Sequence, residues 1–500
     1  MEQLLCNEPV AAMGFLAALF TIAVSVGMWG MILSRERFTG GVKLLEEDNP
    51  LAFISPDILK FRHSFQITLP KCAVVMPVKG VHEGSADNWR SQVTSMYGGP
   101  LNFLFVVESE ADPAFAAIRR LIAELSEFSI KLLVAGETWH CSQKMHNQLT
   151  GFEAALGMGA KYVILLDDDI HLHPGTIRYW VEEMESDPKV LVASGYTFDW
   201  VGPGVRGWPA YLWMMWRLVA AVGFNDPKDR PKHIWGGAMM FRAEELRRNV
   251  CSLMDAWADG GYSEDWASHS LARYHGRTLC VPKAALFPTE LGEVSWPRFT
   301  NYLKRQLFVL TSTWASPHQR YLAYGAQLYN NVMGVAAIGG VVTACPLVAL
   351  LAARAVGVGD GAPVLGTDGR CAEPALGAAA FAASMLLVAY TCKRAVRAYA
   401  GLCTTLSPMD TPVQYAHMSL WRLAGAYLGY CLLVPLICTW CFCCNSVIWS
   451  GVRYTFRGGK VHTVHRRNTA GEWYTQSRAE SMEKAFRRTA ERSLAARGLE

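Results

Sequence analysis

The stretch at residues 161–173, KYVILLDDDIHLH, decides the fold. Residues 162–166 form an apolar run of strand length that is rich in β-branched residues, and three aspartates follow where the run ends. Side chains alternate along an extended backbone, so we expect Asp167 and Asp169 to point to one side and Asp168 to the other. The stretch therefore predicts a buried strand that delivers two carboxylates to one place.

Two neighbouring carboxylates repel each other unless a cation lies between them. A hard divalent ion with oxygen ligands, Mg²⁺ or Mn²⁺, suits Asp167 and Asp169 and keeps positions for water and phosphate oxygens. Because ligands bind at the carboxyl ends of strands in open α/β sheets, this is a candidate metal and diphosphate site. The alternative is an Asp-rich turn that caps a helix beginning near Pro174, and the motif alone leaves both readings open.

Strands and helices alternate on both sides of this motif, within residues 60–315. We expect strands at residues 72–76, 101–107, 130–134 and 162–166, with Asp112 and Ser142 capping helices between them. This order predicts an α/β domain with a mostly parallel, doubly wound sheet and right-handed crossovers. The edge where its ligands gather would carry residues 77–80 (PVKG), Glu108 and residues 167–169.

The rest of the chain is typical of a membrane protein. Of its 500 residues 51% are hydrophobic and 18% charged, and the small net charge of +4 gives no reason to expect a nucleic-acid partner. Residues 1–34 contain an apolar anchor, and the basic residues after it place the next domain in the cytosol by the positive-inside rule. We expect two to three further spans in residues 329–450, at 332–351, 375–390 and 423–448. Three spans would put the charged tail, residues 451–500, in the lumen against that rule, so one segment is re-entrant or interfacial, or the rule fails here.

The second half of the α/β domain carries three further features. Residues 208–224, WPAYLWMMWRLVAAVGF, are either a core helix or an interfacial helix. At residues 263–265 (SED), Ser263 can cap a helix whose first turn holds Glu264 and Asp265, as an acidic pair favoured by the helix dipole or as a general base. The basic patch at residues 298–307 includes Arg305, whose guanidinium suits phosphate oxygens.

In this order the motifs resemble those of the ceramide glucosyltransferases, membrane-bound GT-A-type glycosyltransferases, and look most like the plant and algal branch. Residues 77–81 (PVKGV) resemble the family's P-x-K-G motif, and residues 302–306 (YLKRQ) stand at its (Q/R)-x-x-R-W signature, with Tyr302 and Gln306 replacing the first and last residues. Residues 449–454 (WSGVRY) resemble its W-x-G-x-x-Y segment. The acidic motifs correspond to Glu108, usually Asp in the family, to Asp167 and Asp169, and to Asp265.

The resemblance implies a GT-A fold and a metal-dependent, inverting transfer of glucose from UDP-glucose to the primary hydroxyl of ceramide. It implies that Asp265 is the base, that Arg305 stabilises the leaving group and that Asp167 and Asp169 hold Mg²⁺ or Mn²⁺; the expected donor-binding residues are Lys79, Glu108, Lys144, Asp167 and Gln306. It also implies an integral membrane protein of the Golgi or endoplasmic reticulum with the catalytic domain facing the cytosol. The alternatives are another lipid acceptor (a sterol, diacylglycerol or polyprenyl phosphate) and an inactive membrane scaffold, and the sequence predicts no oligomeric state.

Overall fold

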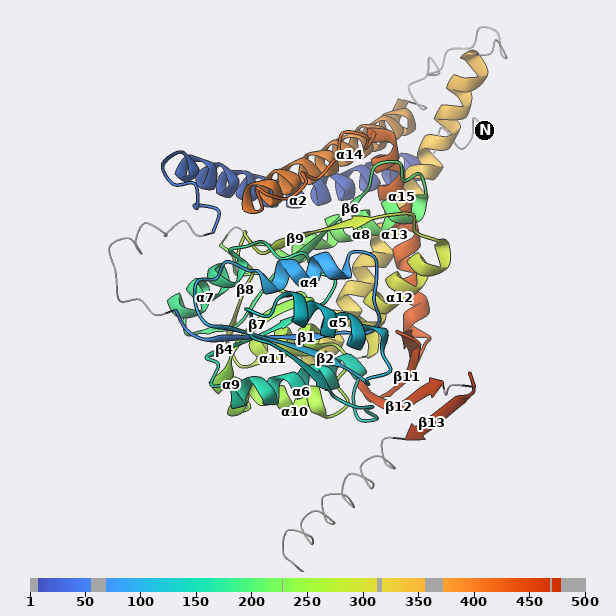
Figure 1. Cartoon of the computed structure of the whole chain (residues 1–500). Helices are drawn as coiled ribbons and strands as arrows, with labels where there is room; N and C mark the ends of the chain where they lie inside the picture. Colours follow the sequence, from blue (N-terminus) through green and yellow to red (C-terminus); the bar gives the residue numbers. More distant parts are fainter. Residues whose placement is uncertain are drawn as a thin grey trace, which may run out of the picture.

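The computed structural model describes residues 8–54, 69–226, 228–312, 317–355, 372–467 and 470–477 (Figure 1). Its centre is a seven-stranded sheet in the order β3-β2-β1-β4-β7-β5-β8. These strands are β1 Cys72–Pro77, β2 Leu101–Val107, β3 Ile130–Val134, β4 Tyr162–Leu166, β5 Val190–Ser194, β7 Ala238–Arg242 and β8 Thr278–Cys280. The neighbouring strands β1 to β4 all pair in parallel, whereas β7 is antiparallel to both β4 and β5. The expected α/β class with a mostly parallel sheet is confirmed.

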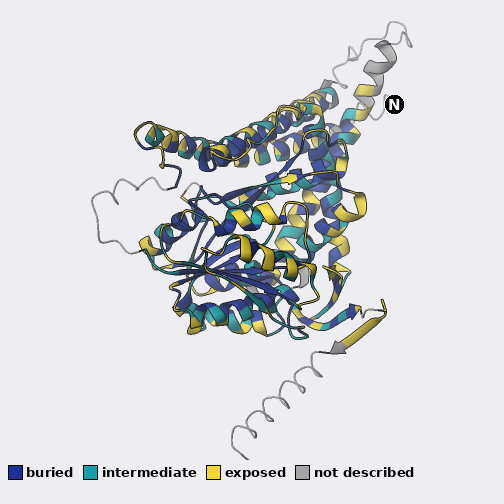
Figure 2. Cartoon of the chain, viewed as in Figure 1, coloured by how far each residue is buried: buried dark blue, intermediate teal, exposed yellow. Residues whose placement is uncertain are grey.

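Helices cover both faces of this sheet. One face carries a core that includes Trp89, Phe105 and Trp180, and the other carries a core that includes Phe152 and Trp257. The helices are α4 Ser85–Val93, α5 Pro113–Glu124, α6 Gln143–Gly157, α7 Thr176–Ser186, α9 Ala243–Arg247, α10 Leu253–Ala258 and α11 Glu264–Tyr274. Figure 2 shows that the strands are buried and that exposed residues lie on the outer faces of the surrounding helices.

Two sequence-predicted caps fix the loops at the ligand edge of the sheet. The Asp112 carboxylate accepts a hydrogen bond from Ala114 N at 2.9 Å and another from Gly80 N at 2.8 Å. The Ser142 hydroxyl accepts one from Met145 N at 3.2 Å and so begins α6. Both caps are confirmed, and Asp112 also holds the loop that follows β1.

A second layer joins the sheet domain to the membrane helices. Strands β6 Tyr196–Val201 and β9 Leu286–Leu291 pair in parallel, and α8 Trp208–Phe224 packs on β6. The opposite side of α8 contacts α2 Glu8–Asp48 and α15 Leu420–Phe442. The Trp- and Met-rich helix is thus mostly buried, between the sheet domain and the apolar helices.

Four helices among the described residues are long and apolar enough to cross a membrane. The candidate spans are Ala11–Asp48 in α2, Gln319–Cys345 in α13 Pro317–Ala355, Ala375–Leu406 in α14 Ala372–Leu406, and Leu420–Phe442 in α15. The expectation of one such helix near the N-terminus and up to three near the C-terminus is confirmed, and α2 and α14 lie side by side (Figure 1).

The last expected span, residues 423–448, is too long. Helix α15 ends at Phe442, and Ser446–Trp449 is strand β10. This strand turns through Ser450 and Gly451, both with positive φ, and pairs with β11 Val452–Arg457. A two-residue turn with both φ angles positive suits the twist of a hairpin, so the chain leaves the helix for a sheet.

Strands β12 Lys460–Arg467 and β13 Trp473–Ser477 complete an antiparallel four-stranded sheet, which we call the C-terminal sheet. It docks on the sheet domain, because Val461 N donates to Gly260 O at 2.9 Å and Gln143 N donates to Tyr454 Oη at 3.1 Å. The Tyr262 ring packs against three of its aromatic residues, Trp449, Tyr454 and Phe456. The sequence suggested only a charged tail for residues 451–500, of which 478–500 lie outside the described residues.

Candidate active site

A buried lysine joins two carboxylates at the centre of the site. Lys144 on α6 places its Nζ 2.7 Å from Asp167 Oδ1, at the end of β4, and 2.5 Å from Glu264 Oε1, at the start of α11. The side chains of Lys144 and Glu264 are 14% and 4% exposed. Burial opposes the lysine's charge, but the two carboxylates outweigh it and raise the pKa of Lys144 above its usual value. Three segments far apart in sequence therefore meet in one charged cluster.

The carboxylates of the aspartate motif, residues 167–169, repel one another. Burial raises the pKa of Asp167 to about 7, with Asp169 adding to the shift and Lys144 opposing it. The pKa of Asp169 is also raised, because the surrounding protein atoms limit hydration of its carboxylate even though the residue as a whole is exposed. A divalent cation between the two would relieve their repulsion, so these side chains fit the expected metal. Within the described ranges no three His, Cys, Asp or Glu side chains are grouped to hold a metal, so the remaining ligands would be water and phosphate oxygens.

Asp265 lies beside this cluster and is held by three donors. Its Oδ2 accepts a hydrogen bond from Gly236 N at 2.9 Å, and its Oδ1 accepts from Trp266 N at 2.7 Å and from the Ser263 hydroxyl. Ser263 therefore orients Asp265 and makes no side-chain cap to α11, the helix it precedes. Burial raises the pKa of Asp265, and the neighbouring Glu264 adds to the shift. A fixed carboxylate with a raised pKa has the properties of a general base.

The glycine turn at residues 235–238 connects Asp265 to the aspartate motif. A Cβ on Gly236 would lie 3.0 Å from Glu264 Oε1 and 3.2 Å from Asp265 Oδ2. The next residue, Gly237, accepts a hydrogen bond from Asp167 N at 2.7 Å through its carbonyl. Gly236 in this turn thus lets the acidic side chains approach the backbone closely.

The basic patch lies on α12 Trp296–Ser312, and its two central residues point in different directions. Arg305 has its guanidinium carbon 5.1 Å from the ring centroid of Trp449 on β10, and Lys144 Nζ is 6.0 Å from the same ring. Lys304 instead lies over Trp440 of α15, at 4.3 Å. The structure therefore brings Arg305 towards the charged cluster, whereas Gln306 is partly buried and makes none of the described contacts with it.

Glu108 and Lys79 meet at the ends of β2 and β1. Glu108 Oε2 is 2.7 Å from Lys79 Nζ, and its Oε1 accepts a hydrogen bond from Arg466 of the C-terminal sheet. Sequence reasoning missed both Arg466 and the bridging role of Glu264. The signal available for Arg466 was the run of β-branched residues Val461, Thr463 and Val464, which favours a strand in the charged tail.

A polar cluster connects the aspartate motif to α8. Asp199 on β6 is 5% exposed in its side chain and accepts hydrogen bonds from Trp213 Nε1 at 2.7 Å and Arg217 Nε at 3.2 Å. The Trp213 ring stacks on Tyr302 at 3.4 Å between centroids. The Tyr302 hydroxyl is buried without a hydrogen-bond partner among the described residues. Because the charges of Asp199 and Arg217 both act on the pKa of Asp169, this cluster lies next to the aspartate motif.

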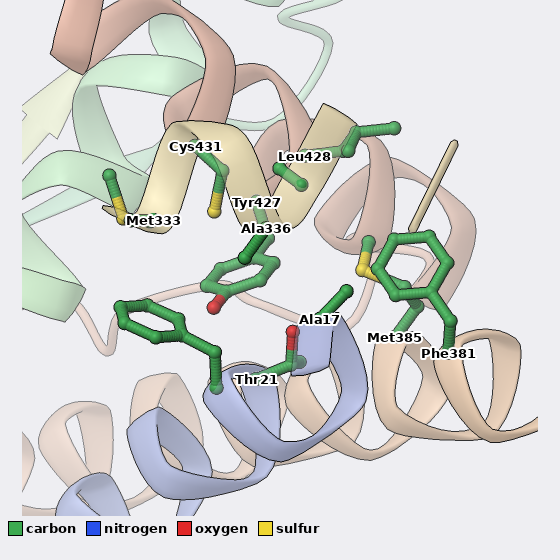
Figure 3. A pocket seen from close by; sticks show the side chains of 11 residues that line it. Ala17, Thr21, Met333, Ala336, Phe381, Met385, Tyr427, Leu428 and Cys431 are labelled. Carbon is green, nitrogen blue, oxygen red and sulfur yellow. The ribbon is translucent and has the colours of Figure 1, made fainter. Parts of the chain in front are cut away.

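A small apolar pocket lies among the four long apolar helices (Figure 3). Its lining comes entirely from α2, α13, α14 and α15, and includes Phe381, Met333 and Leu428. Thr21 and Tyr427 contribute the oxygen atoms seen in Figure 3. The pocket shares no residue with the charged cluster, and most of the side chains that line it are apolar.

One family model and one curated protein match part of this chain. The model of Glycosyl transferase family 21 matches residues 56–199, which include Glu108 and the aspartate motif. Over 125 residues the chain is 30% identical to Ceramide glucosyltransferase 1 of Caenorhabditis elegans, an alignment that covers 25% of this chain and about a quarter (26%) of that protein.

Two solved structures are also similar to this chain. The mannosyltransferase PcManGT from Pyrobaculum calidifontis, in complex with GDP-Man and Mn²⁺, has a TM-score of 0.38 and 16% identity and covers 73% of this chain and 98% of its own. S. aureus TarS 1–349 has a TM-score of 0.31 and 11% identity, with coverages of 78% and 98%. Over residues 56–199, the family match agrees with the resemblance to the ceramide glucosyltransferases that the motifs indicate.

Proposed function

We propose that the protein transfers glucose from UDP-glucose to the primary hydroxyl of ceramide, with inversion at the anomeric carbon. The observation that carries this proposal is the position of Asp265, a carboxylate fixed by Gly236 N and Trp266 N beside a cluster of Lys144, Asp167 and Glu264. One base next to one group of phosphate-binding charges is what a single displacement requires. The family resemblance supports the choice of glucose and ceramide.

In this reaction Asp265 takes the proton of the acceptor hydroxyl as that oxygen attacks the anomeric carbon. The new carbon–oxygen bond forms while the bond to the diphosphate breaks, so no covalent sugar intermediate is needed. Lys144 and Arg305 supply positive charge to the leaving diphosphate. Asp167 and Asp169 would hold the Mg²⁺ or Mn²⁺, which when bound acts as a Lewis acid on the same oxygens.

The acceptor would arrive from the side of α8. This helix packs against both the sheet domain and the apolar helices, so a lipid that keeps its chains in the membrane can present its headgroup to Asp265. The cluster of Asp199, Trp213 and Tyr302 offers polar atoms on that side, including the Tyr302 hydroxyl, which has no hydrogen-bond partner in the part of the chain that the structure describes. These groups suit the hydroxyl and amide groups of a sphingolipid headgroup.

The proposed orientation has the catalytic domain in the cytosol, in a Golgi or endoplasmic reticulum membrane. Of the basic residues that follow the first apolar segment, Arg35 is buried and donates to Lys283 O at 2.5 Å and to Asn225 Oδ1, so it anchors α2 to the sheet domain. The orientation therefore rests on the other basic residues, Arg37 and Lys43.

The experiment is sugar transfer in mixed micelles, with UDP-glucose, a fluorescent ceramide and the full-length protein, with and without EDTA. We expect a glucosylceramide product that disappears with the chelator and returns with added Mg²⁺ or Mn²⁺. If the protein transferred glucose to a sterol, diacylglycerol or polyprenyl phosphate but not to ceramide, the acceptor assignment would be wrong and the assigned reaction type would stand. A protein that neither transfers nor hydrolyses UDP-glucose would be the inactive scaffold.

A further inference from the structure

Arg466 brings the C-terminal sheet to the end of β2. Its side chain is 4% exposed, and Nη1 donates to Glu108 Oε1. Nη2 donates to Thr138 O at 3.3 Å and also to Gln143 Oε1. The guanidinium carbon lies 5.3 Å from the ring centroid of Trp139. The arginine is therefore held in one position by groups from the loop before α6 and from the sheet edge.

One nitrogen atom of the Arg466 guanidinium is left without an acceptor among the described residues. This atom is Nε, which is buried. A buried donor without an acceptor costs about 1–3 kcal/mol, more when the group is charged, so a structural role alone leaves the cost unexplained. A bound ligand with an acceptor atom at this place would satisfy it.

The same sheet reaches the other end of the donor site. Trp449 on β10 lies beneath Arg305 and near Lys144, the cations that we assign to the diphosphate. Arg466 on β12 stands at Glu108, next to Lys79. One small sheet thus contacts both ends of a row of charges that runs along the carboxyl ends of the strands.

We propose that the C-terminal sheet completes the nucleotide site, and that Arg466 together with Glu108 recognises the pyrimidine base of a uridine nucleotide. Uracil presents carbonyl acceptors on either side of an N–H donor. The Nε–H of Arg466 supplies a donor to a carbonyl, Glu108 supplies an acceptor for the N–H, and Trp139 supplies an aromatic face beside them. Cytosine exposes an amino donor where uracil exposes a carbonyl, so the same pair of side chains discriminates against it.

This inference rests on the proposed use of a UDP-sugar, and its test needs no acceptor. Binding of UDP, CDP and inorganic diphosphate to the full-length protein in detergent is measured by calorimetry, for the unchanged protein and for Arg466→Gln. We expect the substitution to weaken UDP binding about tenfold or more, to reduce the preference for UDP over CDP, and to leave diphosphate binding unchanged.

Two variants control for folding and charge. Arg467→Gln changes an exposed arginine of the same strand, which lies over Trp473 at 4.6 Å, and should leave all three affinities unchanged. Arg466→Lys keeps the charge next to Glu108 but cannot form the planar fork, so it should keep the unfolding temperature and still lose the preference for UDP over CDP.

The outcomes separate this inference from the proposed function. If the unchanged protein prefers UDP and both Arg466 variants keep that preference, the role of Arg466 is refuted while the donor assignment stands. If Arg466→Gln weakens diphosphate as much as UDP, base recognition is refuted as well. A protein that binds neither nucleotide contradicts both the proposed function and this inference.

Discussion

Replacing Asp265 by asparagine tests the proposed base with the smallest change of shape. The aspartate accepts on Oδ2 from Gly236 N and on Oδ1 from Trp266 N and the Ser263 hydroxyl. Asparagine keeps one acceptor oxygen and brings one NH₂ group. In the orientation that preserves the two bonds to Oδ1, the new NH₂ faces Gly236 N–H, and one backbone donor loses its partner.

The expected effects differ in size between stability and catalysis. The unpaired Gly236 N–H costs about 1–3 kcal/mol, and the loss of a buried negative charge beside Glu264 offsets part of that cost. The variant should therefore fold and bind UDP-glucose. Loss of a general base lowers the rate by about 10²–10⁴-fold, so kcat should fall by that factor while KM for UDP-glucose changes little.

The assay is ceramide glucosylation across a range of pH, with UDP binding measured in parallel. Asp265 acts as a base only when ionised, and burial raises its pKa, so kcat/KM should fall as the pH is lowered through a value above the ordinary range of aspartate. Asp265→Asn should lose this acidic limb. Asp255→Asn, at an exposed position of α10, should behave like the unchanged protein. A kcat of Asp265→Asn within tenfold of normal, or a loss of UDP binding, would refute the assignment.

Three further experiments test the surrounding cluster. Asp169→Ala should weaken UDP binding and make the remaining affinity insensitive to EDTA. If neither the substitution nor EDTA altered the affinity for UDP, the metal assignment would be wrong. Lys144→Met should destabilise the fold by about 3–5 kcal/mol, because Asp167 and Glu264 lose their shared cation, and Glu264→Gln in the same chain should restore part of the unfolding temperature. Gly236→Ala should reduce kcat because its Cβ would lie 3.0 Å from Glu264 Oε1. Unchanged kinetics would show that the turn accommodates the added methyl group and that the close approach does not matter for catalysis.

The parts of the fold that depend on local pattern could be predicted from the sequence. The strands at residues 101–107, 130–134 and 162–166 have the predicted bounds, and the caps at Asp112 and Ser142 form as their residue types favour. The antiparallel direction of β7 could not be predicted, because direction depends on which strands meet across the sheet. The end of α15 was misplaced because the apolar run continues into Val447 and Ile448, and hydrophobic pattern alone does not distinguish a buried helix from a strand in such a run.

The candidate site was predictable where a motif carries its own chemistry. The carboxyl end of β4 places Asp167 beside Lys144, and the start of α11 places Asp265 beside the glycine turn. Sequence patterns gave little indication of contacts between residues that are far apart in the chain. Arg466 reaches Glu108 from 358 residues away, and its partners depend on how the C-terminal sheet docks. No local spacing encodes such a contact.

The docking of the C-terminal sheet also limits how the chain can pass through a bilayer. The sheet domain precedes α13 and the C-terminal sheet follows α15, and the two pack together, so the stretch between them must cross an even number of times. Helix α15 begins where Arg422 donates to Val205 O and Tyr211 Oη, and ends where Cys441 Sγ contacts Lys304 O. Both of its ends thus lie against the catalytic half. If the apolar helices cross a bilayer, α13 and α14 supply the even number of crossings, and the C-terminal sheet lies on the same side of the bilayer as the charged cluster.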